Sequence, residues 1–323
     1  MVESRSKTPV TFDEAAAIVA DAFGPACRLR GCTELTDGYF NAAYRLDLDD
    51  GTTWVLKVAP PPGVEVLWYE HDILHAEIDA LRLVRDHTDA PVPDVVWVDE
   101  ATRLPSPSFV MSYVPGVSLA GARDRLTTEA LADLDATIGG HLAQVHTITS
   151  PTFGLLSPAR PAHTTWRAAF GEIVEFLLLD GERAGVVLPV GYDELRSALV
   201  SCSDALDEVA VANLVLWDLW DGNVLVHPDT GRLGGYLDFE RALWGDPLLE
   251  FQFGPHGRAT AVAAGYGRDL LDSPGAGRRR TLYSLYHHLV LSIEGAYRQY
   301  PADPLGDLAR AGLRADLDAM HRT

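Results

Sequence analysis

The pattern of hydrophobic and polar positions in the first 60 residues predicts one helix followed by a hairpin. Thr11 and Glu14 have the spacing of a capping box before an alanine-rich run, which predicts a helix over about 11–23. Hydrophobic residues then alternate with polar ones on both sides of an Asp50-Gly51 turn signal, and this pattern predicts a β-hairpin over 44–58.

The next segment continues as a mixture of helix and strand. Hydrophobic residues at helical spacing predict a helix over 65–87, and two prolines follow it. Strand-like runs at 94–98 and 108–114 complete a small mixed unit that ends at Pro115-Gly116. We therefore expect a domain boundary at this point.

Beyond the boundary the pattern is mostly helical, with one hairpin-like stretch between 223 and 238. The helical runs lie near 127–148, 166–180, 192–209 and 280–299. The chain therefore predicts an α+β protein with a small, sheet-rich N-terminal lobe and a larger, mostly helical C-terminal lobe.

Composition narrows the classes of partner. The 323 residues are 47% hydrophobic, enough for a sizeable core, and carry a formal net charge of -20. This charge argues against nucleic acid and acidic membranes as partners, and it would suit a cationic substrate or simply reflect solubility. No run approaches the ~20 apolar residues of a membrane span. From this we expect a cytoplasmic protein. The three cysteines are scattered, which does not fit a disulfide framework.

The stretch from Leu216 to Glu240 carries the densest chemical signal. Asn223 opens one strand of the expected hairpin and Asp238 closes the other, so antiparallel pairing should bring their side chains together. Asp218 lies on the loop that leads to the same end. Three oxygen-bearing side chains at one place suit Mg²⁺. Taken singly, each could be a loop former or strand cap, but the joint spacing favours a functional site.

Lys57 is the second candidate, because the chain has only two lysines and the other, Lys7, lies near the N-terminus. Lys57 shares a strand face with small apolar residues, where its ammonium would need a partner. Glu77 is the expected partner, since helical spacing places it on the apolar face of the 65–87 helix; Glu70 is the alternative. An exposed lysine beside a peripheral glutamate is the competing interpretation.

The loop at 37–41 could lay backbone N–H groups over phosphates, with Gly38 and Asn41 as its contacts. It contains a single glycine, so a plain hairpin turn explains it as well.

Together these features resemble the aminoglycoside phosphotransferase and choline kinase family, which has a two-lobed protein-kinase-like fold. The resemblance includes Asp218 with Asn223 five positions later, Asp238 after a short hairpin, and Lys57 with Glu77. It also covers the segments FVMSYVPG at 109–116, HLAQVHTITSPTFG at 141–154 and GDPLLEF at 245–251.

The resemblance implies a role for each matching position. Asp218 would be the catalytic base, Asn223 and Asp238 the Mg²⁺ ligands, and Asp246 a support of the catalytic loop. Lys57 would hold the nucleotide phosphates and Glu77 would fix Lys57. The adenine would meet the backbone of Ser112, Tyr113 and Val114. Residues 1–111 would form the nucleotide-binding lobe, 112–116 the hinge and 117–323 the helical lobe.

One departure from the family pattern concerns the catalytic loop. The family usually has His-Gly before its catalytic aspartate, whereas this chain has Leu216-Trp217. The run from Trp217 to Trp220 is closer to the Asp-Leu-Trp of fructosamine-kinase-like members. This widens the range of acceptors to consider.

The acceptor is expected to be a small molecule, because only seven residues separate Asp238 from Asp246, too few for a peptide-holding activation segment. It should bind between Asp218 and the helices of 160–210 and 250–300. The acidic and aromatic residues expected to contact it are Asp221, Glu240, Trp244 and Glu250.

These observations predict an ATP- or GTP-dependent, Mg²⁺-dependent kinase that phosphorylates a hydroxyl of an aminoglycoside, aminocyclitol or amino sugar, as an antibiotic-resistance enzyme does. A non-antibiotic acceptor, such as a fructosamine or choline-like amine, is an alternative. A catalytically silent nucleotide-binding protein of the same fold is another. A hydrolase with Asp218 and Asp238 as paired carboxylates would leave Lys57 and Glu77 without a role.

Overall fold

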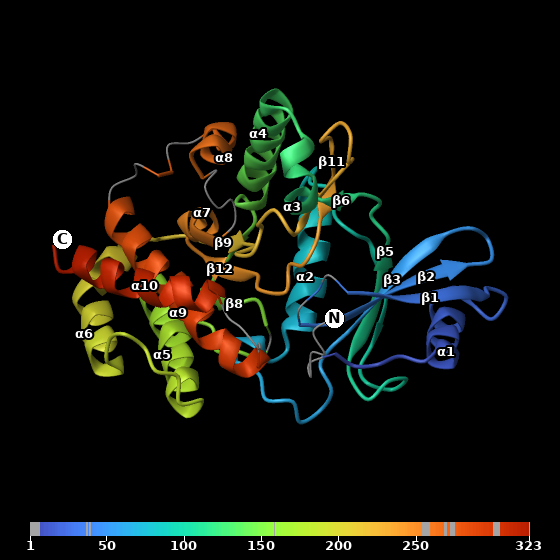
Figure 1. The fold of residues 1–323 in the computed structure, drawn as a ribbon, viewed down its shortest axis with the longest axis horizontal. Coiled ribbons are helices and arrows are strands. Elements are labelled where there is room, and N and C mark those ends of the chain that lie inside the picture. Colours follow the sequence, from blue (N-terminus) through green and yellow to red (C-terminus); the bar gives the residue numbers. More distant parts are fainter. Residues whose placement is uncertain are drawn as a thin grey trace. The chain divides into compact units, whose positions relative to one another are not determined.

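The computed structural model describes residues 7–36, 38, 40–157, 159–253, 259–267, 270–271, 275–299 and 304–322 (Figure 1). Contacts within the chain divide it into two compact units. The first contains the described residues up to Glu65 together with Val92–Pro115, and the second contains Val66–Pro91 and the described residues from Gly116 onward. Among the helices so described, none is long and apolar enough to cross a membrane.

The first unit is an antiparallel sheet with one helix. Its strand order is β1-β2-β3-β5-β4. Helix α1 (Phe12–Phe23) begins at the predicted capping box and packs beside β1 (Figure 1). The strands are β1 (Leu29–Leu35), β2 (Ala42–Leu48), β3 (Thr53–Val58), β4 (Val95–Asp99) and β5 (Ser108–Ser112).

The core of this unit confirms the predicted hairpin. Leu46 pairs with Trp54 in the β2–β3 register, and Leu46 and Leu56 are fully buried. The apolar face of α1, with Ile18 and Val19, completes the same hydrophobic cluster. Strand β1 was not predicted, because its residues are mostly half-buried or exposed and therefore lack strict alternation.

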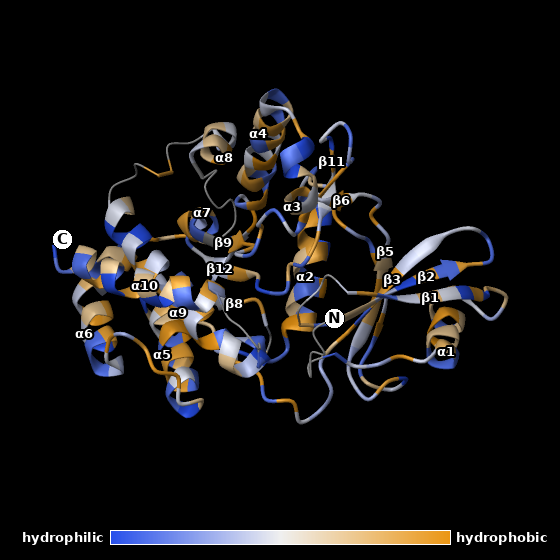
Figure 2. Cartoon of the chain, viewed as in Figure 1, coloured by the Kyte–Doolittle hydropathy of each residue, from blue (hydrophilic) through white to orange (hydrophobic). Residues whose placement is uncertain are grey.

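The second unit is built around helices. Hydrophobic and hydrophilic residues share α5 and α9, as expected for helices that cover a core with one side (Figure 2). The α-helices are α2 (Ile73–His87), α3 (Leu119–Ala122), α4 (Thr128–Val145), α5 (Trp166–Arg183), α6 (Tyr192–Cys202), α7 (Glu250–Phe253), α8 (Ala259–Tyr266), α9 (Ala276–Arg298) and α10 (Pro304–Met320). The short 3-10 turns are η1 (Trp68–Glu70), η2 (Arg123–Arg125), η3 (Ser203–Glu208) and η4 (Pro247–Leu249).

Two small sheets lie within the second unit and carry the segments of chemical interest. The predicted hairpin is confirmed as β10 and β11, and β6 extends it in the order β11-β10-β6. A second sheet has the order β7-β9-β12-β8. The strands are β6 (Val117–Ser118), β7 (Thr149–Ser150), β8 (Gly154–Leu155), β9 (Ala212–Val215), β10 (Val224–Val226), β11 (Leu233–Tyr236) and β12 (Leu243–Gly245).

The prediction of a helix over 65–87 was wrong about where the helix starts. Residue Asp72 adopts a left-handed backbone with φ 69°, so the regular helix α2 begins only at Ile73. Before it, the Glu70 carboxylate accepts a hydrogen bond from Leu67 N at 2.9 Å within the short turn η1. The hydrophobic period alone did not signal this break.

Residues 66–91 group with the second unit rather than with the sheet that precedes them in sequence. Their contacts explain the grouping. Trp68 N donates a hydrogen bond to Asp180 Oδ2 on α5 at 2.6 Å. The ring of Tyr69 packs edge-on against Trp217, with centroids 5.4 Å apart. The 112–116 hinge stays a prediction.

Candidate active site

The β10–β11 hairpin brings Asn223 next to the end of the returning strand. Val224 pairs with Tyr236, and Leu237 N donates to Asn223 O at 2.9 Å. Asp238 follows immediately and adopts φ 67°, a left-handed conformation that is uncommon for a non-glycine residue. Such backbone strain is frequent at functional sites.

Asn223 also closes the loop that carries Asp218. Its side-chain Nδ2 donates to Asp218 O at 2.9 Å, and its backbone N–H donates to Trp220 O at 2.9 Å. Because the amide nitrogen is used on the loop, Oδ1 is the atom of Asn223 that could ligate a cation. The sequence spacing from Asp218 to Asn223 therefore corresponds to a hydrogen-bonded loop.

Two further carboxylates lie beside Asp238. Glu77 of α2 and Glu240 each offer an oxygen, and the ligand atoms of all three residues lie within 4.8 Å of one another. The sequence pattern predicted Glu77 beside Lys57 and Glu240 at the acceptor, and it gave no sign of their shared proximity to Asp238. Carboxylate and amide oxygens are the ligands that Mg²⁺ takes from proteins, so this set fits that ion.

The Asp218 side chain is 23% exposed and faces Arg241, with 3.7 Å between Oδ2 and the guanidinium Nε. Burial raises the pKa of the Asp218 carboxyl to about 7, while the Arg241 charge opposes the rise and Asp238 and Glu294 add to it. The preceding residue, Trp217, has φ 69° and is fully buried. The loop thus presents a carboxylate in a shielded, strained setting.

Glu250 holds the start of this loop from a distant part of the sequence. Its Oε2 accepts hydrogen bonds from Leu216 N at 2.7 Å and from Trp217 N at 3.3 Å. The residue is 0% exposed, so its position does not suit the acceptor contact expected from the sequence. His146 Nε2 lies 3.7 Å from the same carboxylate, and its Nδ1 pairs with Tyr266 OH at 2.9 Å. The imidazole is therefore a core residue.

The Asp246 carboxylate contacts other elements. Its Oδ2 accepts from Arg279 Nε at 2.9 Å and from Tyr283 OH at 2.7 Å, both on α9. Its Oδ1 accepts from Leu248 N at 3.0 Å and caps η4. Among the hydrogen bonds of the described residues, Glu250 rather than Asp246 contacts the loop directly.

Two further expected acceptor contacts are each tied to a different element. Asp221 forms an ion pair with Arg123, with 2.9 Å between Oδ2 and Nη1, and its carbonyl accepts from Ala120 N at 3.0 Å. Trp244 lies in β12 and pairs with Leu214 of β9. The structure thus ties Asp221 to η2 and Trp244 to a sheet.

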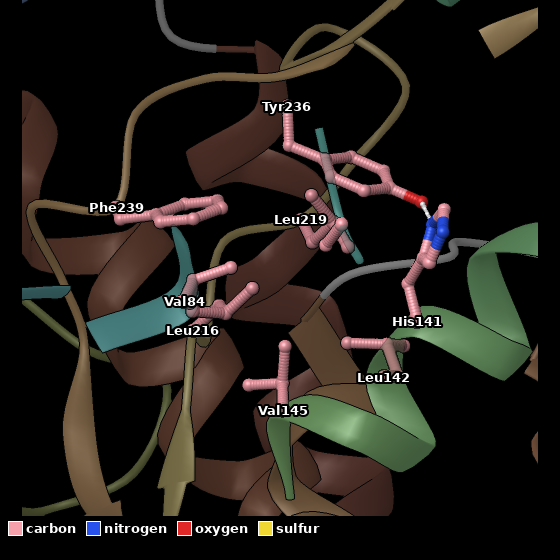
Figure 3. A pocket seen from close by; sticks show the side chains of 9 residues that line it. Val84, His141, Leu142, Val145, Leu216, Leu219, Tyr236 and Phe239 are labelled. Carbon is pink, nitrogen blue, oxygen red and sulfur yellow. Dashed lines mark hydrogen bonds between the residues drawn. The ribbon is translucent and has the colours of Figure 1, made fainter. Parts of the chain in front are cut away.

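A small pocket lies behind the 216–219 part of the loop (Figure 3). Two of its lining residues are polar, His141 and Tyr236, and they are hydrogen-bonded to each other with 2.8 Å between Nδ1 and OH; burial lowers the pKa of the imidazole. The remaining lining residues are apolar, and Phe239 next to Asp238 is one of them: Val84, Ala90, Leu142, Val145, Leu216, Leu219 and Phe239. Apolar packing against α2 and α4 therefore anchors both the loop and the segment after β11.

The predicted nucleotide contacts lie in the first unit. Lys57 is on β3 opposite Phe109 and is 7% exposed, so its ammonium is buried as expected. Asn41 is 4% exposed and Gly38 is exposed, while Asp37 and Tyr39 of the same loop lie outside the described residues. Lys57 and Glu77 belong to different units, and their pairing stays a prediction.

One residue of the predicted hinge, Ser112, already forms hydrogen bonds with Asp94. Ser112 N donates to Asp94 O at 2.9 Å, and Asp94 N donates to Ser112 Oγ at 2.9 Å. The Tyr113 ring lies under the Arg45 guanidinium, with 5.2 Å from Cζ to the ring centroid. A hydrogen-bond donor for a purine would thus come from the backbone after Ser112.

The chain belongs to the phosphotransferase enzyme family, because the model of that family matches residues 31–283, most of the sequence. It is therefore a phosphotransferase, as predicted. None of the curated protein sequences matches the chain significantly.

Solved structures show the same fold. A provisionally assigned fructosamine-3-kinase of Thermobifida fusca YX-ER1 has 20% identity, with 97% of this chain and all of the other covered and a TM-score of 0.71. A thermostable mutant of aminoglycoside phosphotransferase APH(4)-Ia has 19% identity, 95% and 100% coverage and a TM-score of 0.65. The macrolide 2'-phosphotransferase MphH from Brachybacterium faecium has 18% identity, 94% and 98% coverage and a TM-score of 0.57. The predicted protein-kinase-like α+β fold is confirmed.

Proposed function

We propose that this protein transfers a phosphoryl group from ATP or GTP to a hydroxyl of a small, cationic molecule. One observation supports this proposal most strongly. Asn223 lies at one end of β10 and β11, where its Nδ2 donates to Asp218 O and its carbonyl accepts from Leu237 N, the neighbour of Asp238. This arrangement combines a carboxylate for the hydroxyl with oxygen ligands for Mg²⁺.

Asp238 and the Oδ1 atom of Asn223 would hold the Mg²⁺ ion, which supplies charge neutralisation on the nucleotide phosphates. Glu77 and Glu240 lie close enough to Asp238 to share in binding the ion or its waters. The left-handed backbone at Asp238 turns the chain at this point. We therefore expect substitution of Asp238 to weaken Mg-nucleotide binding more than substitution of Asp218 does.

Asp218 would accept a hydrogen bond from the acceptor hydroxyl and take its proton as the new phosphate ester forms. Arg241 stands 3.7 Å from Oδ2, which favours the charged carboxylate without a short hydrogen bond. Glu250 would act as the support of the loop, through its two hydrogen bonds to Leu216 N and Trp217 N. Asp246 would support α9 and η4 instead.

The nucleotide would contact the sheet of the first unit. Lys57 would meet its α- and β-phosphates and pair with Glu77, and the 37–41 loop with Gly38 and Asn41 would lie over the phosphates. The backbone of residues 112–114 would meet the purine. Because Ser112 N already bonds to Asp94 O, the donor to the purine would be Tyr113 N or Val114 N.

The acceptor class is proposed from charge and from the relatives. The net charge of -20 suits a polyamine-bearing sugar, and Asp221, Glu240 and Trp244 would contact it. One solved relative is a ternary complex of APH(4)-Ia with AMP-PNP and hygromycin B, and another is a GDP complex of aminoglycoside 2'-phosphotransferase-IIIa. An aminoglycoside acceptor would make the protein an antibiotic-resistance enzyme. A fructosamine or choline-like acceptor remains the alternative, since the Asp-Leu-Trp run at 218–220 and one relative favour it.

The test is an acceptor screen with the full chain, Mg²⁺ and either ATP or GTP. Aminoglycosides, amino sugars, fructosamines and choline-like amines would each be incubated with the enzyme, and mass spectrometry would detect an added phosphoryl group. We expect one cationic class to be phosphorylated, with matching release of ADP or GDP. Turnover confined to neutral or anionic acceptors would contradict the acceptor class. Nucleotide binding without any product would favour the catalytically silent alternative.

A further inference from the structure

Arg241 occupies a confined space beside Asp218. Its Cζ lies 5.5 Å from the ring centroid of Tyr69 and 5.5 Å from that of Trp217. The Arg241 side chain is 12% exposed. A guanidinium near two aromatic rings gains a favourable interaction with each, and the rings also limit where its planar head can lie.

Two carboxylates compete for this guanidinium. Nη2 donates a hydrogen bond to Glu294 Oε2 of α9 at 3.1 Å, whereas Nε stands 3.7 Å from Asp218 Oδ2. A distance of 3.7 Å is an ion-pair separation and is too long for a hydrogen bond. Among the described residues, the hydrogen bond that fixes the head of Arg241 is therefore the one to Glu294.

The surroundings of Glu294 are themselves well supported. Arg298 lies one helical turn further along α9 and forms an ion pair with Glu70, whose other oxygen accepts from Leu67 N. This pair binds η1 to α9, and η1 carries Tyr69. Helix α9 and η1 thus enclose Arg241 from two sides, and Glu294 has a defined position relative to the Tyr69 ring.

We propose that Glu294 is a positioning residue, which acts on Asp218 through Arg241. By holding the guanidinium at hydrogen-bond distance from itself, Glu294 keeps it from closing on Asp218. The Asp218 carboxylate is then stabilised by a nearby positive charge, while its oxygens stay able to accept the hydrogen of a hydroxyl. This inference rests on the proposed role of Asp218 as the base.

Loss of the Glu294 charge has a defined consequence. Arginine has five N–H donors and pairs readily with a carboxylate in a two-pronged geometry. Without its Glu294 partner, the Arg241 head would move onto Asp218 and occupy the oxygens that the hydroxyl needs. Nucleotide affinity should not change, because the Mg²⁺ ligands proposed above do not include Glu294.

The experiment measures Mg-ATP hydrolysis by the full chain, with water as the acceptor, so that no acceptor contact can contribute. We expect Glu294→Gln to lower the hydrolysis rate by about tenfold or more, because the acceptor that holds Arg241 loses its charge. The KM for ATP should stay within about twofold, which corresponds to a change in binding free energy well below that of one hydrogen bond. Glu294→Asp keeps the charge and should retain more activity than Glu294→Gln.

A double-variant comparison tests whether Glu294 acts through Arg241. Arg241→Met should lower hydrolysis too, and adding Glu294→Gln to it should have no further effect, because coupled residues do not act additively. The matched control is Glu182→Gln, which removes the negative charge that faces Arg196 on the surface of α5 and α6 and should leave hydrolysis unchanged. Thermal melting of every variant separates loss of fold from loss of activity.

Each other outcome overturns the inference. Unchanged hydrolysis in Glu294→Gln would do so, and would also point to an acceptor contact instead. Fully multiplicative losses in the double variant would show that Glu294 acts independently of Arg241. Should Glu294→Gln fail to fold, Glu294→Asp is measured alone and in the Arg241→Met background. A loss that disappears in that background supports the inference, and an equal loss in both backgrounds overturns it. Failure of the proposed function is a separate result, seen as hydrolysis that is insensitive to Asp218→Asn.

Discussion

The β10–β11 hairpin and the 216–222 loop meet at the same site, yet they are held in different ways. The hairpin is fixed by backbone hydrogen bonds between residues close in sequence, such as His227 N to Arg232 O at 2.9 Å. The loop is fixed by side chains, of which Glu250 comes from a helix far along the chain. The hairpin should therefore tolerate side-chain changes that the loop does not.

The largest loss of stability is expected for Glu250→Ala. It would leave the buried N–H groups of Leu216 and Trp217 without their acceptor, and loss of a charged acceptor costs about 3 kcal/mol of the free energy of unfolding. Denaturant unfolding measures the change, and turnover should fall with it. Glu182→Ala, which alters an exposed pair, is the control. An unfolding midpoint equal to that of the unaltered protein would show that the loop does not depend on Glu250.

A smaller effect is expected for Gly222→Ala. A Cβ at this position would lie 2.2 Å from Trp220 Cζ2, so the indole or the loop must shift, at about 1 to 2 kcal/mol. Because Gly222 lies between Asp218 and Asn223, we also expect lower turnover. Gly140→Ala in α4 is the matched control, since nothing lies within 4 Å of its added Cβ. Equal activity in the two variants would argue against close packing as a constraint on the loop.

The smallest effect is expected for Thr230→Ala at the tip of the hairpin. Its hydroxyl accepts one long hydrogen bond, 3.4 Å from Arg232 N, at an exposed position. The free energy of unfolding should change by less than about 0.5 kcal/mol, as is usual for surface substitutions, and turnover should not change. Kinetics and denaturant unfolding on the same preparation check both values. A large loss would mean that the tip contributes to the site after all.

The same contrast explains what the sequence could predict. The antiparallel pairing of a hairpin depends on residues close in sequence, so the position of Asn223 and Asp238 at one end of a hairpin could be predicted from the sequence alone. The burial of Lys57 agrees with its position on a strand face that it shares with small apolar residues. Pairing between neighbouring segments and the hydrophobic pattern of a strand can both be inferred directly from the sequence.

Other parts depend on contacts that no local pattern displays. Glu250 was expected at the acceptor because it is acidic and follows the catalytic segment, yet it is buried against Leu216 and Trp217. Strands β9 and β12 are only a few residues long and pair across the sequence, so alternation could not identify them. The break at Asp72 depends on one backbone angle. The partnership of Glu294 with Arg241 likewise required the packing of α9.

The most direct test of the account compares Asp218→Asn with the unaltered enzyme. Asparagine keeps the shape of the side chain but cannot take a proton, so Mg-nucleotide turnover should fall by about 10² to 10⁴-fold. The Kd for Mg-ATP should stay the same, because the proposed Mg²⁺ ligands Asn223 and Asp238 are unaltered. Turnover at the rate of the unaltered enzyme, with the same Kd, would contradict the assignment of Asp218 as the base.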